Sequence, residues 1–410
     1  MAAKNSKVDN AFVISQYYGF EGLDLTQIEK DDHDKAKKLK NYADFEHSHL
    51  PKIEDAIALL RHTNSDEHKK KELPLLYYSK GDFKNPHDKK AKKRAGDSVS
   101  LHIIGTPKSI AEAILIKTAY TILKEEGFKN LSVEINNIGD KDTLSAYGKH
   151  STNYFRSKLA DLDTDCKELL KFGGHTLVTC NIKGVKHVLK EAPAPIEFLN
   201  EENRTHLKEV VEYLESQKIP FEINKFVLGD PHYSSHTVFT IMDEKTGKIL
   251  ATGSRYNELA KKTLTRKGVP AVSVSIRLPK FKTVPTSKTP KFEDCDIYFI
   301  QLGYGAKLKS LEVIEILRKA GIPVHQSIGR DKMTTQTAFA HRKNVKYILL
   351  LGQKEALENS VCVRNMETNA QKTVPLDTLV DYLSELRIKD KATEKEKAKK
   401  TAAADKKKAK

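Results

Sequence analysis

The chain has 410 residues, of which 39% are hydrophobic and 31% are charged. This composition excludes collagen-like, disulfide-scaffold and mostly disordered chains, and the length suggests two or three domains. No apolar stretch approaches the ~20 residues that would span a bilayer, so we expect no membrane association. The first 15 residues lack an apolar core, so we expect no signal peptide. Four widely spaced cysteines without a CxxC pair indicate reduced thiols in a cytoplasmic protein and no metal site.

The formal net charge is +16, and a field of that sign attracts polyanions such as nucleic acids. The same charge also fits an ordinary basic enzyme surface. Residues 387–410 hold eleven Lys/Arg against four Asp/Glu, so this segment supplies seven of the sixteen charges. Because it has no apolar face, we expect it to be a basic disordered tail.

The first 72 residues predict a divergent N-terminal segment, with a helix over 53–61 and a short strand or docking segment over 12–18. Strands and helices then alternate irregularly over residues 73–280, which favours an α+β domain with a largely antiparallel sheet. The expected strands of this sheet are 101–104, 131–135, 221–228, 237–242, 249–252 and 272–276. A helix over 110–126 should end at Gly127.

Residues 281–292 contain two prolines and no periodicity, so we expect an interdomain linker. Regular strand–helix alternation follows over residues 293–386 and predicts a compact α/β module with parallel strand pairs. The expected strands are 296–301, 324–325 and 347–351, and the expected helices are 307–320, 334–342 and 379–386.

Stand-alone catalytic signatures are missing from the sequence, which has no GxxxxGK[ST], HExxH or GxSxG motif. Gly303-Tyr304-Gly305 is only a GxG and does not indicate a dinucleotide site. His232 and His236 are four residues apart, but they follow Pro231 in strand-rich sequence, so we do not expect them to share a metal.

Three short segments occur in a characteristic order: TVFT at 237–240, GSRYN at 253–257 and PAV at 270–272. This set resembles the histidyl-tRNA synthetase family, which has TVFE, GGRYD and PAVG at similar spacing. The segment EINNIGD at 134–140 resembles the family's EINSLGD, and residues 351–383 resemble the end of its anticodon-binding domain. The collinear resemblance covers roughly residues 73–386.

The resemblance implies a class II synthetase-like antiparallel sheet flanked by helices, followed by an α/β anticodon-binding-like domain. Members of the family activate histidine with ATP and Mg²⁺ and then esterify tRNA. The residues that the retained motifs carry over as remnants of a substrate pocket are Tyr233, Gly253, Arg255 and Tyr256.

The departures from the family fall on its chemistry. Where the family has three phosphate- or carboxylate-binding arginines, this chain has Lys84, Gly229 and Lys280. Where the family holds histidine with Gln and Glu, it has Ser98 and His102. Displacement at an α-phosphate needs fixed cations, so we expect histidine activation to be lost or much reduced. We therefore assign no catalytic residue and no cofactor, with ATP and Mg²⁺ expected only if ligase activity survives.

The favoured interpretation is a synthetase-like protein that binds tRNA or another RNA. The alternatives are an active divergent histidine–tRNA ligase and a non-catalytic regulatory subunit that binds a protein partner; a homodimer is compatible with all three. The candidate RNA contacts are Lys89, Lys90, Lys92, Lys93, Arg94, Arg330, Lys332, Gln336, Arg342 and Lys343. Each of these sets also fits an ordinary solvated surface.

Overall fold

The computed structural model of the protein describes residues 6–23, 28–39, 53–84, 94–179, 186–230, 233–263, 269–286, 289–292, 295–327 and 329–388. The chain divides into two compact units, Met1–Thr289 and Pro290–Lys410. Their boundary falls within the expected 281–292 linker, and the N-terminal segment belongs to the first unit.

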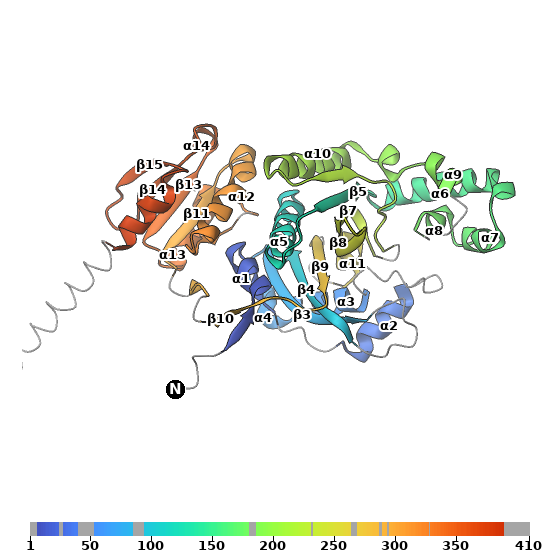
Figure 1. Ribbon diagram of the computed structural model, residues 1–410, viewed down its shortest axis with the longest axis horizontal. Coiled ribbons are helices and arrows are strands. Elements are labelled where there is room, and N and C mark those ends of the chain that lie inside the picture. The colour runs from blue at the N-terminus through green and yellow to red at the C-terminus, as the bar shows by residue number, and fades with distance from the viewer. Residues whose placement is uncertain are drawn as a thin grey trace, which may run out of the picture. The chain divides into compact units, whose positions relative to one another are not determined.

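The first unit is built on an eight-stranded sheet with the order β2-β3-β4-β9-β8-β7-β5-β6 (Figure 1). The strands are β2 (Glu21–Gly22), β3 (Leu75–Lys84), β4 (Arg94–Ile104), β5 (Leu131–Asn137), β6 (Phe221–Ile223), β7 (Ser235–Asp243), β8 (Lys248–Arg255) and β9 (Ala271–Leu278). All neighbouring pairs are antiparallel except β2–β3 and β5–β6. The predicted antiparallel sheet is confirmed, but the expected strand over 221–228 is shorter than predicted and lies parallel to β5.

Helix α5 (Ile110–Glu126) is buried on nearly all sides, because it packs between the sheet and two other helices. It contacts β4 and β9 on one side, and α1 (Asn10–Tyr17) and α10 (Glu201–Ser216) on the other. Gly127 ends the helix with a φ of 110°, and its N–H donates to the carbonyls of Leu123 and Lys124. The predicted helix and its glycine cap are confirmed. Residues 12–18 lie mostly in α1, so the predicted strand there is wrong.

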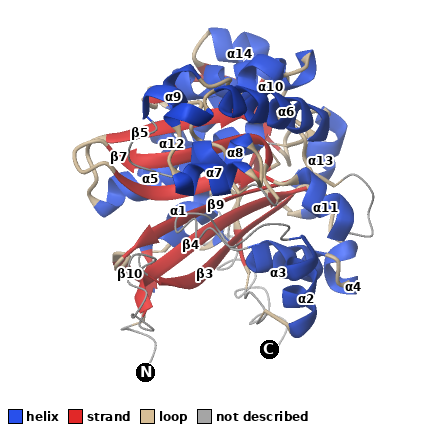
Figure 2. Ribbon diagram, turned by 90° about the vertical axis from the view of Figure 1, so that its right-hand side faces the viewer, coloured by secondary structure: helices blue, strands red, loops and turns tan. Residues whose placement is uncertain are grey.

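A second helical group packs around Leu75 and Tyr77 of β3 and Ala271 of β9. It consists of α2 (Lys30–Leu39), α3 (Ile53–Thr63) and α11 (Asn257–Thr263), which lie beside each other in Figure 2; the short α4 (Asp66–Lys69) follows α3. The predicted helix over 53–61 is confirmed as α3.

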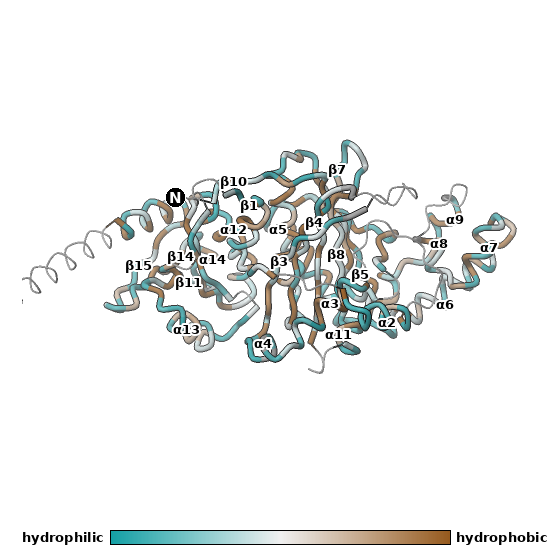
Figure 3. Tube along the Cα trace, turned by 90° about the horizontal axis from the view of Figure 1, so that it is seen from below, coloured by the Kyte–Doolittle hydropathy of each residue, from teal (hydrophilic) through white to brown (hydrophobic). Residues whose placement is uncertain are grey.

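The two faces of the central strands differ in chemistry, because successive residues of a strand point to opposite sides. Val99, Leu101 and Ile103 of β4 are almost fully buried on one face, paired with Ile276, Val274 and Val272 of β9. The other face of the same two strands carries serines and one histidine. Figure 3 shows brown, hydrophobic stretches along the central strands. The sheet therefore has an apolar face toward α5 and a hydroxyl-rich face opposite.

A helical lobe is inserted between β5 and α10, and it occupies the right-hand end of the first unit in Figure 1. It contains α6 (Lys141–Ser157), a 3-10 turn (Leu159–Asp161), α7 (Thr164–Leu170), α8 (Gly174–Thr179), α9 (Lys186–Glu191) and a second 3-10 turn (Pro195–Phe198). Phe155, Cys166 and Leu177 are among the residues of its own small core.

A strand near the N-terminus pairs with a strand near the end of the first unit. Strand β1 (Lys7–Asp9) pairs antiparallel with β10 (Thr283–Pro285), which lies within the expected linker. Lys80 of β3 lies 2.6 Å from the Asp9 carboxylate, so charge also links this pair to the main sheet.

The second unit contains a five-stranded sheet with the order β12-β11-β13-β14-β15. The strands are β11 (Ile297–Gln301), β12 (His325–Gln326), β13 (Tyr347–Leu351), β14 (Ser360–Asn365) and β15 (Gln371–Pro375). The helices are α12 (Tyr304–Lys319), α13 (Met333–Arg342), α14 (Gln353–Leu357) and a final helical segment over 379–388. Strand β11 is parallel to both β12 and β13, which confirms the predicted parallel pairs. None of the helices in the described residues is both long and apolar enough to cross a membrane.

Candidate functional site

The hydroxyl-rich face of the first unit's sheet is organised around His102, which is buried near the C-terminal end of β4. One ring nitrogen, Nε2, lies 3.1 Å from the Ser79 hydroxyl, and the other, Nδ1, lies 2.8 Å from the Ser273 hydroxyl. Ser273 in turn lies 2.6 Å from the Tyr256 hydroxyl. These four side chains form one hydrogen-bonded chain across β3, β4 and β9.

The chemistry of this chain is that of a neutral imidazole. Burial lowers the pKa of His102 from 6.5 to about 3. A neutral ring has one N–H to donate and one nitrogen to accept, and both are already engaged by Ser79 and Ser273. His102 is therefore internally satisfied and carries no negative charge that could pair an ammonium group.

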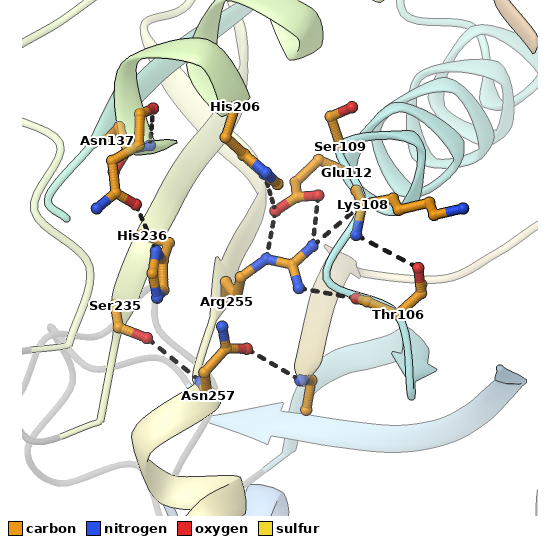
Figure 4. Close-up of polar contacts among 12 residues, drawn as sticks. Thr106, Lys108, Ser109, Glu112, Asn137, His206, Ser235, His236, Arg255 and Asn257 are labelled. Atoms are coloured by element: carbon orange, nitrogen blue, oxygen red, sulfur yellow. Dashed lines mark hydrogen bonds and ion pairs between the residues drawn. The ribbon is translucent and has the colours of Figure 1, made fainter. Parts of the chain in front are cut away.

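The opposite face of the sheet holds a second polar group, drawn in Figure 4. Arg255, at the end of β8, is 1% exposed. Its guanidinium group forms a bidentate ion pair with the carboxylate of Glu112 on α5. The Nε–Oε1 distance is 2.6 Å and the Nη2–Oε2 distance is 2.7 Å. His206 of α10 adds a third contact, 3.1 Å from Glu112 Oε1.

The ion pair is strongly coupled because both side chains are buried. Burial alone would raise the pKa of Glu112, but Arg255 and His206 beside it hold that pKa well below its usual value. The third guanidinium nitrogen, Nη1, donates to the backbone carbonyl of Thr106 at 3.0 Å, and Nη2 also donates to that of Lys108 at 3.4 Å. Arg255 thus joins β8 to the turn before α5 and to α5 itself.

The four predicted pocket residues do not share one site. Tyr233 and Tyr256 pack edge to face, with ring centroids 6.1 Å apart, on the side where Tyr256 reaches Ser273. Arg255 pairs across the strands with Val272 and Gly253 with Val274, so both lie on the α5 face. Gly253 and Arg255 therefore lie on the opposite face of the sheet from the Tyr256 hydroxyl. A Cβ at Gly253 would lie 2.2 Å from the Phe239 ring, which gives this glycine a packing role.

The residues at the positions of the family's arginines place little positive charge on the hydroxyl-rich face. Gly229 has a φ of +68°, and a Cβ there would lie 2.6 Å from Ser234 Oγ, so the turn has no room for a side chain. Lys280 is exposed just beyond β9. Lys84 ends β3, and its side chain lies outside what the structure describes.

One other cation does lie on the hydroxyl-rich face. Arg277 is paired with Ser98 across β4 and β9, and it is half-buried. Burial lowers the pKa of Arg277, while Tyr233 and Asp55 oppose that shift. Arg277 aligns with the glycine of the family's third motif, and the sequence left open whether Lys280 or Arg277 takes the place of that motif's arginine.

The basic residues of the second unit gather around α13. Arg330 and Arg342 each stack on the Phe339 ring, with their guanidinium carbons 4.1 Å and 4.0 Å from its centroid. Lys332 and Lys343 are exposed at the two ends of the same helix. Phe339 was not predicted as part of this surface. Its position three residues before Arg342 could have indicated it, because residues at this spacing share one face of a helix.

The prediction that Gln336 contacts RNA is wrong. Its side chain is fully buried, and its amide nitrogen donates to the carbonyls of Gln301 at 2.9 Å and Arg330 at 3.2 Å. Its oxygen accepts from the Gln301 N–H at 3.3 Å. Gln336 therefore fixes α13 to β11.

The remaining predicted RNA contacts belong to the basic run that leads into β4. Lys89, Lys90, Lys92 and Lys93 lie outside the described residues, as does the Arg94 side chain. Of the two histidines considered for a metal, His232 is also outside, whereas His236 Nδ1 lies 2.7 Å from the Asn203 side-chain oxygen. The described residues contain no group of three potential metal ligands.

Comparison with known proteins relates both units to one family. Residues 296–386, which are nearly the whole described second unit, match the anticodon binding domain family. Over 315 residues the chain is 27% identical to the histidine–tRNA ligase of Bacillus velezensis, covering 75% of this chain and 74% of the relative. The chain is similar to histidine–tRNA ligases over about three quarters of its length, and its second unit matches an anticodon binding domain.

Two further proteins show a similar degree of likeness. The histidine–tRNA ligase of Aquifex aeolicus is 28% identical over 304 residues, which cover 74% of each chain. A crystal structure of the apo histidyl-tRNA synthetase of Staphylococcus aureus is 20% identical, with a TM-score of 0.48, over 91% of this chain and 93% of that one. The α/β module of the second unit is thus an anticodon-binding-type domain, and the first unit is built on a largely antiparallel sheet flanked by helices.

Proposed function

We propose that this histidyl-tRNA synthetase-like protein binds tRNA or another RNA through its second unit and activates histidine weakly or not at all. The proposal that histidine activation is weak or lost rests on the environment of His102. At the position where the family's carboxylate holds histidine, both ring nitrogens of a neutral imidazole are occupied by Ser79 and Ser273. A binding site selects its substrate strongly only when its buried polar groups pair with that substrate. The ring nitrogens of His102 are already paired within the protein, so they do not contribute to such selection.

The electrostatics of the same face also support reduced activation. Adenylation places charge on an α-phosphate and a pyrophosphate, and preorganised cations stabilise it. The turn at Gly229 has no side chain, and Lys280 is exposed. Arg277 is a single half-buried cation among serine and threonine hydroxyls. If ATP and Mg²⁺ bind here, they meet less fixed positive charge than the family's motifs provide.

RNA binding is supported by the surface around α13. The Arg330 and Arg342 guanidinium groups stack on Phe339. Because these side chains are already ordered, the entropic cost of binding a base or a phosphate is lower. Lys332 and Lys343 extend this positive surface at both ends of the helix. Guanidinium planes and cations of this kind bind single-stranded bases and backbone phosphates.

Binding of bulk tRNA to the full chain, measured by fluorescence anisotropy between 50 and 200 mM salt, tests this proposal. The triple variant Lys332→Ala/Arg342→Ala/Lys343→Ala should weaken binding and flatten the salt dependence by about 0.7–0.9 in log–log slope for each lost phosphate contact. A matched triple variant, Lys309→Ala/Lys319→Ala/Lys354→Ala, removes equal charge from exposed or partly exposed helix positions in the same unit. If both triples behave alike, α13 is not the RNA-reading surface and a protein partner becomes the better interpretation.

A further inference from the structure

The helical lobe of the first unit contains a hollow of about 450 Å³ that the proposed function does not use. Its size falls within the range of small-ligand sites. One wall is the face of α6 that carries Ser145, Lys149, Thr152 and Arg156 at helical spacing, and the other is formed by Gly173 and His175. Leu144, Gly148 and Asn153 complete the lining.

The lining has the composition of an anion site. Lys149 and Arg156 supply two positive charges from positions about two turns apart on one helix, and Ser145 and Asn153 add hydrogen-bond donors. No carboxylate is among the lining residues in this described part of the chain. Two cations without a competing carboxylate favour a group with several negatively charged oxygens.

Glycines give the hollow its shape. Gly148 lies in the middle of α6, where glycine costs roughly 0.5–1 kcal/mol relative to alanine. A Cβ at this position would meet nothing within 4 Å, so close packing does not require the glycine. Because Gly148 lines the hollow, a larger side chain at this position would fill part of it.

The opposite wall depends on a second glycine pair. Gly173 has a φ of +115°, and a Cβ at Gly174 would lie 2.4 Å from the Ser151 backbone carbon, so the start of α8 can approach α6 only without side chains. The Gly174 N–H donates to Thr152 Oγ1 at 2.8 Å, which fixes this approach. The wall is therefore held in place by the backbone.

We propose that this hollow binds a phosphoryl group, held by the exposed side chains of Lys149 and Arg156. The group comes either from a small phosphorylated compound or from a backbone phosphate of RNA. The site is independent of the α13 surface, because all of its residues lie in the first unit.

The test uses the full chain with inorganic phosphate, followed by ³¹P line broadening, and then with AMP and a short single-stranded RNA. The double variant Lys149→Ala/Arg156→Ala should lower phosphate affinity at least about tenfold, because each charge-assisted contact contributes about that factor. The matched control, Lys208→Ala/Lys261→Ala, removes two exposed lysines of the same unit and should change affinity less than about twofold.

A third variant separates binding from folding. Gly148→Leu keeps both cations and improves helix propensity, so it should abolish phosphate binding while the melting temperature stays the same or rises. If AMP affinity alone falls in the pocket variants, the ligand is a small phosphorylated compound; if RNA affinity falls as well, it is a backbone phosphate. If phosphate affinity is the same in the wild type, the pocket double variant and Gly148→Leu, the proposal is overturned, whatever the α13 variants do to RNA binding.

Discussion

Arg255 and Glu112 form a two-pronged ion pair in which both side chains are almost fully buried, and this pair connects β8 to α5. Removing one partner leaves the other charge buried without compensation, which typically costs 3–5 kcal/mol. Arg255→Met should therefore destabilise the first unit by about that amount in urea unfolding at pH 7. The exposed pair Lys261–Glu258 is the comparison, and Lys261→Ala should cost less than about 1 kcal/mol. Equal effects of the two substitutions would mean that the buried pair is not structural.

The His102 hydrogen-bond chain predicts a pH dependence of stability. The folded-state pKa of His102 is about 3, below its value of 6.5 when exposed, so the unfolded chain takes up the proton first. The resulting stabilisation is complete above pH 6.5 and falls as the pH drops from 6.5 toward 3. Each pH unit in this window is worth about 1.4 kcal/mol, so about 2 kcal/mol should be lost between pH 7 and pH 5.

The variant His102→Gln isolates this contribution, because the other histidines with lowered pKa values, His236 and His325, remain in both proteins. Urea unfolding at pH 7, 6 and 5 should give a smaller loss of stability in the variant than in the wild type. Parallel pH profiles for the two proteins would show that His102 takes up its proton in the folded state and is not held neutral.

The buried Gln336 amide should matter for stability and not directly for RNA. Gln336→Leu removes the partners of the Gln301 backbone groups and of the Arg330 carbonyl. Leaving buried polar groups unpaired costs about 1–3 kcal/mol each, so the second unit should lose about 2–4 kcal/mol of unfolding free energy. Below the unfolding transition, tRNA affinity should change less than in the Lys332/Arg342/Lys343 triple variant. A stable Gln336→Leu protein with the larger RNA defect would contradict this assignment.

The turn at Gly229 should reject the arginine that the family has there. Gly229→Ala combines an unfavourable positive φ with a contact of 2.6 Å to Ser234, whereas Gly247→Ala has a similar φ of +66° and open space around it. The left-handed conformation costs about 1–2 kcal/mol in both, and the contact should add about 1–3 kcal/mol to Gly229→Ala alone. Thermal unfolding of the two variants gives the difference directly. Gly229→Arg should accordingly fail to restore catalysis.

The sequence predicted the strands of the main sheet because their apolar residues alternate, as in Val99, Leu101 and Ile103. It did not predict which face each motif residue occupies. Arg255 and Tyr256 are adjacent in one motif, yet they engage opposite sides of the sheet. The partner of Arg255 was visible only as Glu112, the one acid in the first four turns of a mostly apolar helix.

Other local errors have similar causes. Residues 12–18 are rich in aromatic and β-branched side chains, which favour a strand, but packing against α5 makes them helical. Strand β15 exposes four of its five residues, so its pattern carried no signal. Gln336 looked like a surface residue because polar side chains are mostly exposed, and its burial depends on contacts with β11 that the sequence does not reveal.

Histidine-dependent ATP–pyrophosphate exchange by the purified full chain tests the central claim most directly, with the Aquifex aeolicus histidine–tRNA ligase assayed in parallel as the active reference. Loss of one preorganised electrostatic contact typically costs 10²–10³ in rate, and at least two are altered here. We expect exchange at least about 10⁴-fold below the reference and no dependence on added histidine. Histidine-dependent exchange within about tenfold of the reference would contradict the account and establish an active, divergent ligase.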